Sequence, residues 1–128
     1  MLTELERQRA TVLLCHPDQS VRLNLRRALE ELKFKQISEV ASHGKAIELL
    51  KERHFSHILF DSTPTNVDPS AFVLGVLRDT PETILLALSN LPEAERIFAL
   101  LQCGTRGYLI LPASKESLLE SVIFASKG

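Results

Sequence analysis

The feature that most limits how this chain can fold is an uninterrupted apolar segment, Ile58–Phe60, that leads directly into Asp61. Short, uniformly apolar segments of this kind are typical of strands whose two faces are both buried. Asp61 is therefore expected where the strand leaves the core. The loop that follows is rich in turn-forming residues and ends at Asp68 and Pro69, an N-cap residue and a proline suited to the first helical position. This stretch predicts a buried strand, a carboxylate at its tip and a loop into a helix, which together make a candidate site.

Apolar segments of strand length alternate with helical patterns along the whole chain. We expect strands at residues 11–15, 36–41, 57–61, 83–88 and 108–111. We expect helices at about residues 20–32, 45–53, 69–78, 94–103 and 114–126. Short connections, and strands apolar enough to be covered on both faces, predict an α/β fold with a parallel sheet and right-handed crossovers. In such sheets chemistry collects beyond the carboxyl ends of the strands, which here are residues 15–18, 61–63, 89–90 and 111–112.

Composition excludes several classes of protein. A chain of 128 residues, 45% hydrophobic and 24% charged, fits one globular domain, with residues 1–10 as a charged N-terminal extension. A formal net charge of −1 gives no attraction for a phosphate backbone, so we expect no direct contact with nucleic acid. No signal peptide and no stretch of ~20 apolar residues is present, which predicts a cytoplasmic protein without membrane contact. Cys15 and Cys103 are expected to be buried, reduced thiols, and no zinc-ligand spacing occurs.

Several segments match the pattern of a known family. They are Val12–Leu14 before a polar turn, Ser20–Arg22, Glu39–Ala41 with Ala46, Ile58–Asp61 with Asp68, and Gly104–Leu109 followed by Pro112. Through these segments the chain, from Thr11 to Lys127, resembles the CheY-like receiver domains of bacterial two-component response regulators. The last segment is similar to that of the NarL/FixJ subgroup, in which a linker and a LuxR-type DNA-binding domain would follow residue 128. The resemblance implies a flavodoxin-like (βα)5 three-layer sandwich with five parallel strands in the order 2-1-3-4-5.

The resemblance also implies roles for individual residues. Asp61 matches the phosphoacceptor that receives a phosphoryl group from a sensor histidine kinase. Ser89 matches the hydroxyl residue that bonds the phosphoryl oxygen, and Tyr108 matches the aromatic switch on the fifth strand. For these two positions we weigh simpler interpretations as well: Ser89 as a hydroxyl that caps the next turn, and Tyr108 as a packing residue.

Three departures from the family pattern weaken the implied chemistry. The acidic pair after the first strand is replaced by His16 and Pro17, and the lysine before the last proline is replaced by Leu111. The family's Asp-Gly before the third helix is Asp68-Pro69 here. Proline carries no ligand and a neutral histidine prefers softer metals, so Mg²⁺ binding should be weak or absent.

If Mg²⁺ does bind, Asp61, Asp18 and Thr63 are the remaining candidates for its ligands, although strand-to-loop geometry points Asp18 away from Asp61. Loss of the lysine should cost roughly 3 kcal/mol of transition-state stabilisation, and loss of the metal several more. We therefore expect no enzyme activity beyond a slow self-phosphorylation of Asp61, and no required cofactor.

The histidines raise a separate hypothesis. His16, as an imidazolium, would stand beside Asp61 and replace the missing positive charge in a pH-sensitive ion pair. The alternative is that His16 is an exposed loop residue with no partner. The other three histidines, His43, His54 and His57, are expected to face solvent or a strand edge.

Apolar residues on the last two helices exceed what one buried stripe requires. The last helix carries Phe124 besides its core positions, and the helix at residues 94–103 carries Phe98 and Leu100 besides its own. A helix that is apolar over more than one face usually meets a partner. We expect a homodimer through the last helix together with the helix at 20–32 or the helix at 94–103; a wide core stripe is the alternative.

Three functions are consistent with these observations. The first is an atypical receiver domain in a phosphorelay, acting mainly through protein contacts with a histidine kinase or another signalling protein. The second is a receiver that is phosphorylated at Asp61 and regulates transcription through a LuxR-type domain. The third, a flavodoxin-like cofactor-binding enzyme, needs a glycine-rich or hydroxyl-rich phosphate loop after the first strand, where residues 16–20 offer proline and acid.

Overall fold

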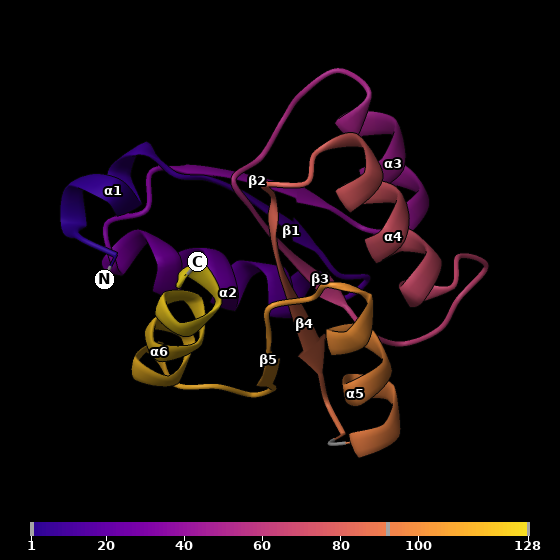
Figure 1. The fold of residues 1–128 in the computed structure, drawn as a ribbon. Coiled ribbons are helices and arrows are strands. Elements are labelled where there is room, and N and C mark those ends of the chain that lie inside the picture. Colours follow the sequence, from indigo (N-terminus) through magenta and orange to yellow (C-terminus); the bar gives the residue numbers. More distant parts are fainter. Residues whose placement is uncertain (1, 92, 128) are drawn as a thin grey trace.

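A computed structural model describes residues 2–91 and 93–127 (Figure 1). The strands are β1 (Thr11–Cys15), β2 (Gln36–Val40), β3 (His57–Asp61), β4 (Ile84–Ser89) and β5 (Gly107–Ile110). The helices are α1 (Glu4–Arg9), α2 (Gln19–Glu31), α3 (His43–Leu50), α4 (Pro69–Asp79), α5 (Ala94–Cys103) and α6 (Lys115–Ser126). All neighbouring strands are parallel and follow the order β2-β1-β3-β4-β5, which confirms the predicted α/β fold and its sheet order. Pro92 was expected in the loop before α5 and lies outside the described residues.

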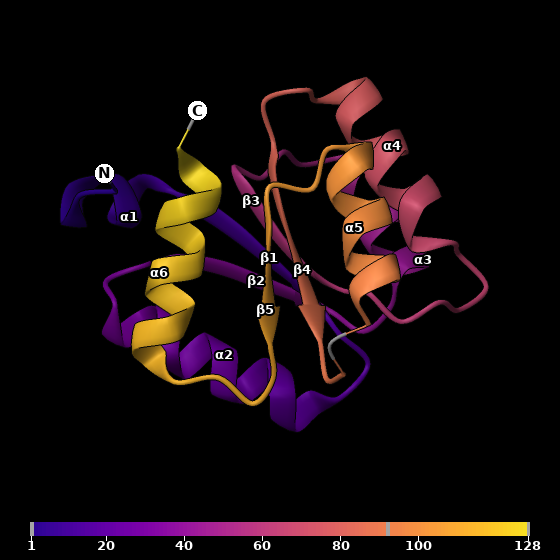
Figure 2. The same cartoon turned by 60° about the horizontal axis from the view of Figure 1, so that its bottom comes forward.

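Helices cover both faces of the sheet. Figures 1 and 2 show α1, α2 and α6 on one side and α3, α4 and α5 on the other. The side chains of β1 alternate between the two layers: Val12 and Leu14 join the core under α2 and α6, whereas Leu13 and Cys15 join the core under α3 and α4. This double burial explains why the central strands are apolar at every position.

The edge strands depart from that pattern. Burial is complete along β3 but only partial along β2, and on β5 the side chain of Tyr108 is 47% exposed between buried Gly107 and Leu109. The expectation that every strand is covered on both faces is therefore wrong for the outer two. Each of them has a neighbouring strand on one side alone, so the flanking helices protect it less completely.

Local signals set the helix ends, and Asp68 is the N-cap that was predicted. Asp18, Ser42, Asp68 and Ser114 each accept a backbone N–H bond as the N-cap of the following helix. Gly104 ends α5 with a left-handed φ of 118°, a conformation that suits glycine. The N-terminal extension forms a helix of its own, α1, which a capping box at its first turn stabilises.

Strand β3 begins at His57, which was expected to face solvent or a strand edge. The side chain lies at the end of the strand, as one of these alternatives has it, but it is buried and not solvent-facing. Its ring lies between two hydroxyl groups, with Ser56 Oγ 2.8 Å from Nδ1 and Ser126 Oγ 2.9 Å from Nε2. The Ser126 hydroxyl donates to the Val122 carbonyl, so its oxygen accepts the proton of Nε2. Burial lowers the pKa of His57 to about 4. His57 thereby ties the sheet to the end of α6.

The apolar surface of α5 differs in one residue from the prediction. Leu100 is buried, whereas Leu101 is 38% exposed, next to Phe98 at 61%. On α6, Phe124 is 65% exposed as expected. The excess of apolar residues is real, and its members are Phe98, Leu101 and Phe124.

Candidate functional site at the carboxyl end of strand β3

Asp61 is the last residue of β3 and lies at the carboxyl edge of the sheet, opposite Leu88 of β4. Its residue surface is only 7% exposed. One carboxylate oxygen, Oδ1, accepts the backbone N–H of Thr63 at 3.2 Å. Among residues 2–91 and 93–127 no ion pair includes Asp61. The structure therefore holds a largely buried carboxylate that is poorly compensated by hydrogen bonds or charge.

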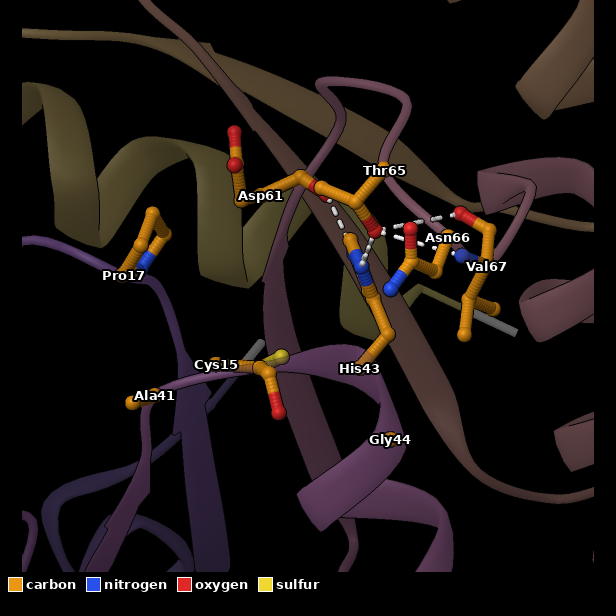
Figure 3. Close-up of a pocket in the computed structure, with 10 residues that line it drawn as sticks. Cys15, Pro17, Ala41, His43, Gly44, Asp61, Thr65, Asn66 and Val67 are labelled. Atoms are coloured by element: carbon orange, nitrogen blue, oxygen red, sulfur yellow. Dashed lines mark hydrogen bonds between the residues drawn. The ribbon is translucent and has the colours of Figure 1, made fainter.

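A cavity of about 360 Å³ opens beside this carboxylate (Figure 3). Its walls come from three places: the end of β1 with Cys15 and Pro17, the start of α3 with Ala41 and His43, and the loop at residues 65–67. Burial and the nearby Asp61 carboxylate raise the pKa of the Cys15 thiol to about 12. A thiol this hard to ionise is not a nucleophile at neutral pH, so Cys15 serves as part of the wall.

His16 does not supply the positive charge that was predicted for it. The residue is buried, and its Nδ1 accepts the backbone N–H of Asp18 at 3.0 Å, which leaves the ring proton on Nε2. Burial lowers the pKa of His16, against the opposite influence of the Asp61 and Asp18 carboxylates. The ring is therefore neutral, and both the imidazolium hypothesis and the exposed-loop alternative are wrong.

Arginines from α2 fix the loop that carries His16 and Pro17. Arg22 donates to the His16 carbonyl at 2.6 Å and pairs through Nε with Glu39 at 3.1 Å. Arg26 pairs with the other oxygen of Glu39 at 2.6 Å and donates to the Ile37 carbonyl. Hydrogen bonds from Arg26 and then Arg22 hold the pKa of Glu39 below its usual value. These two arginines therefore join α2 to β2 and to the site loop.

The residues around Asp61 do not fit a magnesium site. Pro17 has no side-chain donor atom, and His16 uses one nitrogen for the loop. The carboxylate of Asp18 is engaged as the N-cap of α2, where it accepts the N–H groups of Ser20 and Val21. Within the described ranges no cluster of three His, Cys, Asp or Glu side chains could hold a metal. Mg²⁺ binds about six oxygen ligands in octahedral geometry, and this site offers one carboxylate.

His43 is a functional neighbour that sequence reasoning missed. It was expected to face solvent, yet it is buried and its Nε2–H donates to the Asp61 carbonyl at 2.7 Å. Its ring packs against Phe72 with 5.2 Å between centroids, and Nδ1 lies 3.4 Å from the Thr65 hydroxyl. His43 thus joins the start of α3 to the end of β3 and to the site loop. Its position straight after the Ser42 N-cap, at the edge where the strands end, is the signal that could have found it.

The structure places the other expected site residues in different surroundings. Ser89 is at the same sheet edge as Asp61, but its hydroxyl donates to the Leu91 carbonyl within its own loop. Tyr108 lies in a groove lined by β5 and α6, with Leu101 beside it. Leu111 packs in the core together with Leu118, where the family has its lysine. Asp61 and Ser89 are therefore neighbours, whereas Tyr108 and Leu111 face other parts of the molecule.

Comparison with known proteins rests on the fold. No protein-family model and no curated protein matches the sequence. The structure of the chemotaxis response regulator CheY4 of Vibrio cholerae matches with a TM-score of 0.80 and 21% identity, over 91% of this chain and 98% of that one. A putative response regulator from Chloroflexus aurantiacus matches with a TM-score of 0.82 and 17% identity, over 92% and 98%.

A third match is the RcsB response regulator of Salmonella typhimurium, whose structure is described in terms of DNA interaction. Its TM-score is 0.79 at 14% identity, and the match covers 89% of this chain and 57% of that one. These likenesses establish that the chain has the fold of response regulator receiver domains. No helix among the described residues is long and apolar enough to cross a membrane.

Proposed function

We propose that this chain is an atypical receiver domain of a two-component phosphorelay, in which Mg²⁺-dependent phosphorylation of Asp61 is weak or absent. The observation that carries the proposal is the isolation of Asp61. It ends the central strand of a receiver fold, as a phosphoacceptor would, while the neighbouring positions hold neutral His16, Pro17 and core-packed Leu111.

The chemistry of phosphoryl transfer gives the reason. Bringing an anionic donor to a carboxylate requires fixed positive charge and alignment. The one arginine directed at the site loop, Arg22, is engaged by Glu39 and the His16 carbonyl. Phosphorylation is therefore expected to be slower by orders of magnitude than in a receiver with a metal and a lysine, and the chain is not an enzyme beyond such self-modification.

Beryllofluoride with Mg²⁺ tests the proposal, because this pair mimics a phosphoryl group on a carboxylate. The ¹H–¹⁵N spectrum of the chain should change little at the backbone amides of Asp61, Ser89 and Tyr108. A matched control is the double variant His16→Asp, Pro17→Asp, which returns two carboxylates to the loop and should increase the response. Large saturable shifts in the unmodified chain would instead favour the phosphorylation-competent receiver that controls a LuxR-type domain.

Signalling by such a domain would depend on protein contacts, with a sensor histidine kinase or another signalling protein and with a second copy. Exposed Phe98, Leu101, Tyr108 and Phe124 line one face formed by α5, β5 and α6. Beside Tyr108 and Phe124 this face holds a groove of about 620 Å³. These features favour a homodimer through α6 with α5, rather than α6 with α2.

Sedimentation at tens of micromolar tests the dimer. We expect the unmodified chain to dimerise and Phe124→Glu to be monomeric, because a charge in an apolar interface is costly to desolvate. Leu74→Glu is the matched control, since Leu74 is similarly exposed but lies on α4. A monomer in every case would rule out this interface.

A further inference from the structure

The cavity beside Asp61 has a chemical character that neither phosphoryl transfer nor partner contact uses. Its wall is mostly apolar, with Cys15, Pro17, Ala41 and Val67, and its volume of about 360 Å³ falls within the range of small-molecule sites. Asp61 is the carboxylate in this wall, and its Oδ1 accepts a backbone N–H. From this combination we infer that the cavity binds a small organic ammonium ion whose charged group meets the Asp61 carboxylate.

The sign of the charge follows from the groups that surround the carboxylate. Within residues 2–91 and 93–127 no Lys, Arg or His forms an ion pair with Asp61. Arg22 is held by Glu39, and the ring of His16 is neutral. A carboxylate with little exposure and no counterion gains more from a cation than one in water, because the surroundings screen the attraction less. The same surroundings repel phosphate and other anions.

The acceptor sites of the carboxylate limit the form of the cation. Thr63 uses one acceptor site of Oδ1, and the remaining sites of the carboxylate are free to accept N–H groups from a cation. An ammonium group is a compact charge that these free sites can bind. Mg²⁺ is disfavoured, because it requires several hard oxygen ligands and the site presents one carboxylate.

Two further polar side chains of the wall, His43 and Thr65, already have hydrogen-bond partners, and Ser42 and Asn66 complete the polar part of the lining. His43 uses Nε2–H on the Asp61 carbonyl, and the Thr65 hydroxyl bonds to the Val67 carbonyl, so neither attracts water strongly into the cavity. Figure 3 shows the sulfur of Cys15 and the ring of Pro17 on the side of the cavity opposite the loop at residues 65–67. In the inferred complex a short alkyl chain would lie between these walls, with its ammonium end at the Asp61 carboxylate.

Titration of the ¹⁵N-labelled chain with n-butylammonium chloride, at ionic strength held constant with NaCl, tests the inference. Saturable shifts are expected at the amides of Cys15, Gly44 and Thr63, with a dissociation constant on the order of 1 mM, as suits a ligand of so few atoms. n-Butanol has the same body without the charge, and KCl has charge without the body, so both should bind at least tenfold more weakly.

Two variants separate this site from a nonspecific effect. Asp61→Asn keeps the shape but removes the charge and should weaken n-butylammonium at least tenfold, whereas the matched control Asp79→Asn, an exposed carboxylate on α4, should not. Ala41→Leu fills the cavity and should abolish binding while Asp61 is retained. Far-UV circular dichroism verifies that each variant is folded.

The inference is overturned by absent saturation, by equal binding to Asp61→Asn, by KCl binding as tightly, or by Mg²⁺ displacing n-butylammonium below millimolar concentration. It is independent of the proposed function. A strong response to beryllofluoride would contradict weak phosphorylation and leave ammonium binding to be decided by the titration.

Discussion

The two ends of strand β3 each carry a buried titratable side chain, and the two side chains differ in how many hydrogen-bond partners they have. At the amino end, both nitrogens of His57 have hydroxyl partners, and Ser56 is further joined to Thr11 through reciprocal bonds of 2.9 Å. At the carboxyl end, Asp61 receives a single backbone N–H from Thr63 and no ion pair within the described residues. A satisfied polar network rigidifies a fold, whereas an unsatisfied group is retained at a cost to stability. The comparison assigns a structural role to the amino edge and leaves the carboxyl edge as the candidate functional site.

The largest expected effect concerns the pH dependence of stability at the amino end. The pKa of His57 is about 4 in the folded chain and 6.5 in its ordinary state, so the unfolded chain binds more protons between these values. The contribution of His57 to the free energy of unfolding is therefore fully present above pH 6.5. It is lost as the pH decreases towards 4, which lowers the free energy of unfolding by about 3 kcal/mol. Urea unfolding across this range measures the loss.

Variants of two histidines assign that effect. His57→Gln cannot titrate, so the free energy of unfolding should vary less with pH in this range, although the variant is less stable at pH 7. The matched control is His54→Gln, because His54 is exposed and its replacement should leave the profile unchanged. Identical slopes for His57→Gln and the unmodified chain would show that the buried ring is not the source.

A second prediction concerns Gly104, which leads into the amino end of β5. An added Cβ would overlap Cδ1 of Leu77, and φ is 118°, so Gly104→Ala should destabilise the chain by about 2 kcal/mol. Gly75→Ala is the control: it lies within α4 with no atom near its added Cβ, so it should stabilise by up to about 1 kcal/mol. If Gly104→Ala and Gly75→Ala changed the free energy of unfolding equally in chemical unfolding, the turn before β5 would not require a glycine.

The smallest expected effect lies at the carboxyl end. Asp61→Asn removes a desolvated charge and keeps an oxygen that can accept the Thr63 N–H, so the free energy of unfolding should rise by up to about 1 kcal/mol. Asp79→Asn on the exposed end of α4 should change it by less than about 0.5 kcal/mol. A clear loss of stability in Asp61→Asn would mean that the carboxylate supports the fold, contrary to the comparison.

Most of the fold followed from local patterns. The apolar segment that ends at Asp61 predicted β3 to the residue, and Asp68 with Pro69 predicted the start of α4. These signals are strong because burial on two faces and capping bonds both act over short distances along the chain. The order of the strands came from the family resemblance, since local patterns do not specify which strands become neighbours.

The details of the site were less accessible, because they depend on contacts between distant residues. The bond from His43 to the Asp61 carbonyl spans eighteen positions, and the one from His57 to Ser126 spans sixty-nine. A histidine next to, or at the end of, a strand or helix carries no local signal of burial, so the burial of His16, His43 and His57 was not predicted. Likewise, the sequence showed that Leu111 stands where a lysine was expected. That its side chain belongs to the core became clear only from its packing with residues of α6.

The two cysteines provide a practical means of observing this protein. Cys15 has a pKa of about 12 and is buried, so it should not react with alkylating reagents at neutral pH. Cys103, at the end of α5, is partly exposed, so the prediction that both thiols are buried is wrong for this one. A maleimide fluorophore should therefore attach at one position of the unmodified chain, near the apolar face of α5, β5 and α6. Its emission would report on events at that face without engineering a label site.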